Sequence, residues 1–121
     1  MSYIKNVNIV DGSLSDVEST LLCIGVFKNH SMTPNGSDID DASGGAISSA
    51  IKVGDIKGKL GEVNYFYVND RRIAFIGLGE KDEINSDTVR LAAGSALRSA
   101  ISKKADSVAL DCFCSGLDSC Q

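Results

Sequence analysis

The chain has 121 residues, which fits a single compact domain, because most domains contain about 100 to 150 residues. Hydrophobic residues make up 43% and charged residues 23%, as in ordinary globular proteins. Twelve basic side chains against sixteen acidic ones give a net charge of −4. This balance disfavours a nucleic-acid or anionic-membrane surface, since such surfaces need clustered lysine and arginine.

The start of the chain does not resemble a signal peptide, because no charged segment after Met1 leads into an apolar stretch. The longest apolar run, Leu21–Phe27, is far shorter than the roughly 20 residues needed to cross a bilayer. We therefore expect a cytoplasmic protein without a membrane span.

The first half of the chain predicts two strands. Residues alternate between apolar and polar from Tyr3 to Val10, which is typical of a half-buried strand. Leu21–Phe27 is continuously apolar, which indicates a strand covered on both faces at the centre of a sheet.

A single amphipathic helix is predicted over residues 34–53. Thr33-Pro34 is a typical helix start, and Gly54 is suited to a left-handed cap. Gly44-Gly45 would be a weak or closely packed point inside this helix. Its early turns would carry the acidic residues Asp38, Asp40 and Asp41, at the positive end of the helix dipole.

The second half of the chain predicts a hairpin, a helix and a last strand. The short Asn69-Asp70 connection indicates that the two strands before and after it are antiparallel neighbours. After a loop over 55–61, the expected elements are strands at Val63–Val68 and Arg72–Leu78, a helix from the Asn85-Ser86-Asp87 cap to Lys103-Lys104, and a strand at Ser107–Phe113. The buried stripe of the helix would be Val89, Ala92, Ala93, Ala96, Leu97, Ala100 and Ile101.

This order of elements predicts an α/β fold, a mixed β-sheet flanked by helices. Two helices do not cover both faces of a five-stranded sheet. We therefore expect exposed apolar surface, a partner, or further sequence that completes the domain.

The four cysteines do not form a convincing metal site. Cys112 and Cys114 are one C-x-C pair without a second pair, Cys120 lies near the end of the sequence, and Cys23 sits in an apolar run. Reduced thiols in a cytosolic protein are the favoured interpretation, with a structural metal as the alternative.

Three short segments are weak candidates for ligand binding. Gly77-Leu78-Gly79 partly matches a dinucleotide turn, but strand termination is favoured because the third glycine is missing. Ser43-Gly44-Gly45 is a possible phosphate cradle, although a tight helix–sheet contact is favoured. Asp40-Asp41 points in two directions on a helix, so dipole stabilisation is favoured over a shared ion.

The histidine and the scattered basic residues do not indicate catalysis. His30 is predicted to be an exposed loop residue without a nucleophile nearby. The basic residues Lys52, Lys57, Lys59 and Arg71-Arg72 are expected to be solvated.

Four segments, in their order and spacing, resemble the N-terminal domain of the leucyl aminopeptidase family, also called cytosol aminopeptidases. The specific parts are the G-D-x-x-G-K-x-G pattern over 54–61 and the G-L-G-E-K-D pattern over 77–82. The Asn69-Asp70 connection is shorter than the family usually has. The likeness runs from about Cys23 to Leu110, and its other segments are Leu22–Phe27 and the stretch from Thr33-Pro34 to Ile47.

The resemblance implies that residues 1–121 form a single non-catalytic N-terminal domain of macrodomain-like, three-layer topology, incomplete at its C-terminal end. Family members carry a larger C-terminal catalytic domain that binds two divalent metal ions, zinc or manganese. They remove N-terminal residues, preferentially leucine, from peptides and are known as homohexamers. Their Asn-Thr-Asp-Ala-Glu-Gly-Arg signature is not in this sequence. Consequently no catalytic, cofactor-binding or metal-binding residue is assigned here.

Two other functions remain open. A free-standing macrodomain-like module could bind ADP-ribose or a related nucleotide, with Ser43-Gly44-Gly45 as its phosphate cradle. DNA binding, which some members of the family add to peptidase activity, is disfavoured by the acidic balance.

Overall fold

The computed structural model describes residues 6–10, 21–32, 34–68 and 70–111. Within these residues, the elements follow the predicted order, except that two helices stand where the sequence predicts one. The elements are β1 (Asn6–Val10), β2 (Leu21–Phe27), α1 (Pro34–Ala42), α2 (Ala46–Val53), β3 (Val63–Val68), β4 (Arg71–Gly79), the 3-10 helix η1 (Lys81–Glu83), α3 (Ser86–Ser102) and β5 (Ser107–Asp111). The predicted first and last strands reach Tyr3 and Phe113, so parts of both lie outside the described residues.

The strands form one mixed sheet in the order β1-β5-β2-β4-β3. β3 runs antiparallel to β4, and the other neighbours are parallel. β2 lies at the centre with all seven residues buried, as its uninterrupted apolar sequence predicts. The expected α/β class, a mixed sheet flanked by helices, is confirmed.

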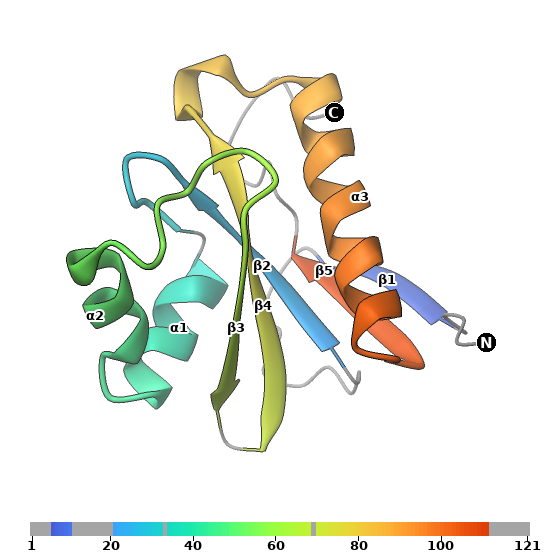
Figure 1. Cartoon of the computed structure of the whole chain (residues 1–121), viewed down its shortest axis with the longest axis horizontal. Helices are drawn as coiled ribbons and strands as arrows, with labels where there is room; N and C mark the ends of the chain where they lie inside the picture. Colours follow the sequence, from blue (N-terminus) through green and yellow to red (C-terminus); the bar gives the residue numbers. More distant parts are fainter. Residues whose placement is uncertain (1–5, 11–20, 33, 69, 112–121) are drawn as a thin grey trace.

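The helices lie in two layers, with α1 and α2 on one face of the sheet and α3 on the other (Figure 1). Each face has its own apolar core. On the α1–α2 side the core includes Ile47, Ile56 and Phe75, and on the α3 side it includes Leu21, Ile76 and Val108. The molecule therefore has three layers.

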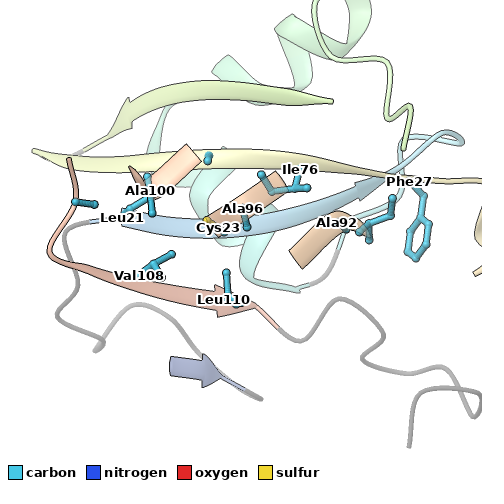
Figure 2. Packing of buried hydrophobic residues seen from close by; sticks show 12 residues of the cluster. Leu21, Cys23, Phe27, Ile76, Ala92, Ala96, Ala100, Val108 and Leu110 are labelled. Carbon is cyan, nitrogen blue, oxygen red and sulfur yellow. The ribbon is translucent and has the colours of Figure 1, made fainter. Parts of the chain in front are cut away.

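Helix α3 packs closely on the sheet because its inner face is made of alanine. Ala92, Ala96 and Ala100 are fully buried, and Figure 2 shows them along β2. Asn85 caps the helix as predicted, since its side chain accepts hydrogen bonds from the Asp87 and Thr88 backbone N–H groups. Ile101 was expected in the buried stripe but is 50% exposed, because it lies on the outer side of the last turn.

The predicted single helix over 34–53 is wrong, because the chain forms two helices there. Gly44 and Gly45 have φ angles of 72° and 88°, in the left-handed region that ends a right-handed helix. A Cβ at either position would meet nothing within 4 Å, so the expected tight helix–sheet contact at these glycines is also wrong. They form an open turn between α1 and α2.

The break in the helix changes the role of the acidic residues. The sequence predicts Asp40 and Asp41 in the early turns of a long helix. Because α1 ends at Ala42, they lie instead in its last turn. The Asp40 carboxylate accepts hydrogen bonds from the Ile47 and Ser48 backbone N–H groups at 3.0 and 2.9 Å, and from the Ser48 hydroxyl. Asp40 therefore stabilises the start of the next helix, α2, by capping it.

Several large apolar side chains of the described residues are exposed, most of them on helices and not on the sheet. The exposed fractions are 74% for Val53, 65% for Tyr67 and 56% for Leu91. Among the described residues, no helix is both long and apolar enough to cross a bilayer.

We predict that Asp40→Ala destabilises the fold by about 1 kcal/mol at neutral pH, the usual cost of removing a helix cap. The Ser48 hydroxyl, followed by the Ser48 and Ile47 backbone N–H groups, lowers the pKa of Asp40. A carboxyl with a lowered folded pKa contributes stability above its unfolded pKa, near 4, and loses it as the pH falls through the folded pKa. Urea unfolding at neutral and acidic pH measures both effects.

Asp41→Ala is the matched control, because the exposed Asp41 is the neighbouring residue of the same type. An equal loss of stability in both variants would show that the capping contact contributes nothing.

Candidate functional site

The carboxyl ends of β2 and β4 are the expected position of a binding site, because open α/β sheets bind ligands beyond the carboxyl ends of their strands. Here the loop over residues 54–62 lies across these ends. The Gly79 N–H donates to the Gly58 carbonyl at 2.9 Å, and the Gly77 N–H donates to the Glu62 carbonyl at 2.7 Å. Backbone hydrogen bonds therefore hold the loop directly against the end of β4.

Glu62 holds the loop in shape from within. One carboxylate oxygen, Oε1, accepts hydrogen bonds from the backbone N–H groups of Lys57 and Gly58, at 2.8 and 2.9 Å. These donors would otherwise point into a turn without partners, which is costly when the turn is packed against other atoms. No motif in the sequence indicates this role for Glu62, although the residue directly follows the glycine-rich segment.

Two glycines allow the loop to approach the strands. A Cβ on Gly77 would overlap the Lys59 carbonyl oxygen, and a Cβ on Gly58 would overlap the Phe27 carbonyl oxygen. Both obstacles are backbone atoms, which do not move aside as a flexible side chain would. The glycines of the two most specific sequence segments therefore meet each other in the structure, one segment in the loop and the other in β4.

A shallow hollow of about 260 Å³ remains beside this loop, next to the start of α3. Its charged groups are mixed, with Lys28 3.4 Å from Glu80 in a half-exposed ion pair. The hydroxyl of Thr88, which also borders the hollow, is used in the cap of α3. Among the described residues that line this hollow, no nucleophile lies beside a base. Gly79 is the last residue of β4, as the favoured interpretation of the Gly77-Leu78-Gly79 segment predicts.

The other predicted candidates do not converge on this hollow. His30 is exposed in a turn with a φ of 70°, and its backbone N–H donates to the Phe27 carbonyl. At Ser43-Gly44-Gly45 the α2 N–H donors already have partners, since Ala46 donates to the Ser43 hydroxyl and the next two donate to Asp40. Asp41 is exposed, whereas the Asp40 carboxylate is bonded to the start of α2.

The basic residues behave in two ways. Lys52, Lys57 and Lys59 are exposed, as predicted. Arg72 is not simply solvated, because its Nη1 donates to the Lys103 carbonyl at the end of α3, at 3.0 Å. The partner lies 31 positions away, so no local pattern in the sequence indicates this contact.

Two buried polar residues were missed by the sequence analysis. The Asn35 amide in the first turn of α1 donates to the Asp111 carboxylate at the end of β5, at 3.0 Å. Both side chains are almost fully buried. The bond ties α1 to the last described strand, and only the folded chain brings these residues together.

The described residues do not contain a group of three or more histidine, cysteine, aspartate or glutamate side chains that could hold a metal ion. The family resemblance places its two divalent ions in a C-terminal catalytic domain, and it assigns no ligand for them to these residues. Cys23 is buried as a free thiol. Cys112, Cys114 and Cys120 lie outside the described residues.

Comparison with known proteins gives a consistent result. A family model described as the N-terminal domain of the cytosol aminopeptidase family matches residues 23–118. A cytosol aminopeptidase of Dictyostelium discoideum is 31% identical over 106 residues, which are 80% of this chain and 20% of that protein. A probable cytosol aminopeptidase of Pasteurella multocida is 38% identical over 80 residues, 60% of this chain and 15% of that protein.

A solved structure has the same fold. A tomato leucine aminopeptidase variant superposes with a TM-score of 0.70 and 23% sequence identity, over 90% of this chain and 23% of that chain. The chain spans about a fifth of the length of the curated relatives that it matches.

We predict that Gly77→Ala destabilises the fold by about 3 kcal/mol or more. The new methyl group would overlap the Lys59 carbonyl, and the loop on both sides of Lys59 is hydrogen-bonded to β4. Gly44→Ala is the control, since it adds the same methyl group in open space and costs about 1 kcal/mol through its left-handed backbone. Urea unfolding compares the two. Equal losses would show that the approach of the loop is not tight.

Burial raises the pKa of the Cys23 thiol to about 12, so little thiolate is present at neutral pH. We predict that Cys23 resists alkylation by iodoacetamide in the folded protein and reacts fully in denaturant. Peptide mapping by mass spectrometry reads this site separately from the other cysteines. Rapid labelling of Cys23 under native conditions would contradict the close packing of α3 on β2.

Proposed function

Because this chain belongs to the cytosol aminopeptidase family and matches the N-terminal domain of that family, we propose that it is the non-catalytic scaffold domain of a dinuclear-metal leucyl aminopeptidase. In this proposal, the parent enzyme removes N-terminal amino acids, preferentially leucine, from peptides. Peptide cleavage and metal binding belong to a C-terminal catalytic domain, and this chain contributes to folding and assembly.

The observation that carries the proposal is that the two most family-specific segments, 54–61 and 77–82, serve to pack the backbone of the domain. The glycines at 58 and 77 allow two backbone segments to pack together, and Glu62 closes the loop with hydrogen bonds. These contacts occupy the carboxyl ends of β2 and β4, where an α/β protein would otherwise bind its ligand. Residues that serve packing in this way support a structural role for the domain.

The partner in this proposal is the catalytic domain of the same polypeptide, and the parent enzyme is a cytoplasmic homohexamer. Relatives about five times longer than the matched region support a large additional domain. The zinc or manganese ions would be bound there, because the described residues supply no group of three ligands. We derive no catalytic step from this chain.

The alternative is a free-standing module that binds ADP-ribose or a related nucleotide. Two features favour this alternative, the three-layer fold and the glycine-containing turn at 43–45. Against it, the backbone donors at the start of α2 are already bound to Asp40 and Ser43. A phosphate group would have to displace the Asp40 carboxylate, which repels it.

We predict that the purified chain does not hydrolyse leucine p-nitroanilide above background with added manganese or zinc. The Pasteurella multocida relative, assayed in parallel, serves as the positive control. Turnover that follows this chain through purification would overturn the scaffold proposal. In the same preparation, micromolar binding of ADP-ribose by calorimetry would favour the alternative.

An exchange of domains tests the scaffold role directly. When this chain replaces the matching segment of the Dictyostelium relative, we predict a soluble and active enzyme, whereas the same exchange with Gly77→Ala gives little soluble enzyme. If deletion of the whole segment leaves activity and assembly unchanged, the domain is not a scaffold.

A further inference from the structure

The outer edge of β3 is free among the described residues. β3 is the last strand of the sheet, and Figure 1 is viewed toward this edge, with α3 on one side and α1–α2 on the other. The strand sequence, Val-Asn-Tyr-Phe-Tyr-Val, contains no charge and no proline. Natural edge strands usually carry such residues to prevent pairing with another chain, so this edge is open to an added strand.

The register identifies which backbone groups the edge offers. The Gly77 N–H donates to the Glu62 carbonyl, so Glu62 and every second residue after it bond inward to β4. Val63, Tyr65 and Tyr67 therefore direct their N–H and carbonyl groups outward. These three residues provide one row of donors and acceptors for an extended peptide.

Two hollows border β3 on the α3 side. The first, of about 270 Å³, lies between Gly61, Val63 and Tyr65 on the strand side and Ser95, Arg98 and Ser99 on the helix. The second, of about 510 Å³, lies between Tyr67 near the end of β3, Arg72 near the start of β4, and Lys103 and Lys104 after α3. We call the two hollows together the β3–α3 groove. A strand added to β3 would place every second side chain in it.

The charge of the groove is opposite to that of the whole chain. The net charge of the protein is −4, yet five cationic side chains line the groove against two acidic ones. Lys103 is held over the Tyr65 ring at 4.3 Å, and Arg72 neutralises the carbonyl end of α3 through the Lys103 carbonyl. The cationic residues are Arg71, Arg72, Arg98, Lys103 and Lys104, and the acidic ones are Asp70 and Asp106.

We propose that the β3–α3 groove binds an extended acidic peptide segment, which adds a strand to the free edge of β3 and directs its carboxylate side chains toward Arg98, Lys103 and Lys104. Main-chain hydrogen bonds give affinity in this mode of binding, and the side-chain hollows give selectivity. The added strand would lie on the opposite side of β3 from β4, and the hollows beside it are bordered by Gly61 of the loop and by Arg71 and Arg72 at the start of β4. The proposed site does not depend on the scaffold role.

The test uses a fluorescent synthetic peptide that alternates glutamate and valine, with fluorescence anisotropy as the readout. We expect saturable binding at low salt that weakens as salt is added, because the charges are exposed and screened. A peptide with lysine in place of glutamate should not bind. A glutamate peptide methylated on alternate backbone nitrogens should not bind either, because it cannot pair with the edge.

Two pairs of variants distinguish the contribution of backbone pairing at the β3 edge from that of the cationic side chains. Tyr67→Pro removes an outward N–H but no bond to β4, and Tyr67→Thr keeps that N–H. Loss of one hydrogen bond should weaken binding about fivefold in the proline variant relative to the threonine variant. Arg98→Glu should also weaken binding, whereas Lys52→Glu on α2, in the other helix layer, should not.

The possible results are decisive once circular dichroism shows that each variant is folded. Binding that survives both Tyr67→Pro and backbone methylation would overturn strand addition. Absence of binding to the wild-type chain would overturn the proposal as a whole. Concentration-dependent self-association that Tyr67→Pro abolishes, without peptide binding, would assign the edge to a second copy of this chain instead.

Discussion

The close backbone contact between the loop over 54–62 and the ends of β2 and β4 is the constraint on which the rest of this structure depends. It requires Gly58 and Gly77, because a methyl group at either position would overlap a carbonyl oxygen. Once formed, the contact sets the path of the chain from α2 into β3. It thereby fixes the start of the hairpin that completes one side of the sheet.

The same contact has a consequence for function. Many α/β proteins keep the carboxyl ends of their parallel strands open for a ligand, but here part of that region is filled by the protein's own backbone. Chemically useful groups near it are already engaged, such as Glu62 within the loop and Thr88 in the cap of α3. Among the described residues, the cationic side chains collect instead around two hollows that border the outer strand β3.

The sequence predicted the regular elements well where a local physical signal exists. The apolar run of β2, the short turn after β3 and the Asn85 cap each act within a few residues, and all three are confirmed. Helical periodicity across 34–53 was misleading. Apolar residues recur at three- and four-residue steps in both α1 and α2, so the pattern continues across the glycine turn that separates the two helices. The backbone angles at Gly44 and Gly45 decide the break, and periodicity does not report them.

The sequence by itself determined the class of fold, the family and the absence of the family's catalytic signature, because these depend on local patterns and on residues that can be read directly. Only the tertiary structure decided how distant residues combine. Gly58 meets the end of β2, Asn35 bonds Asp111, and Arg72 reaches the end of α3. Such pairings arise from the packing of layers, which brings together residues that are separated by many positions and carry no mutual signal along the chain.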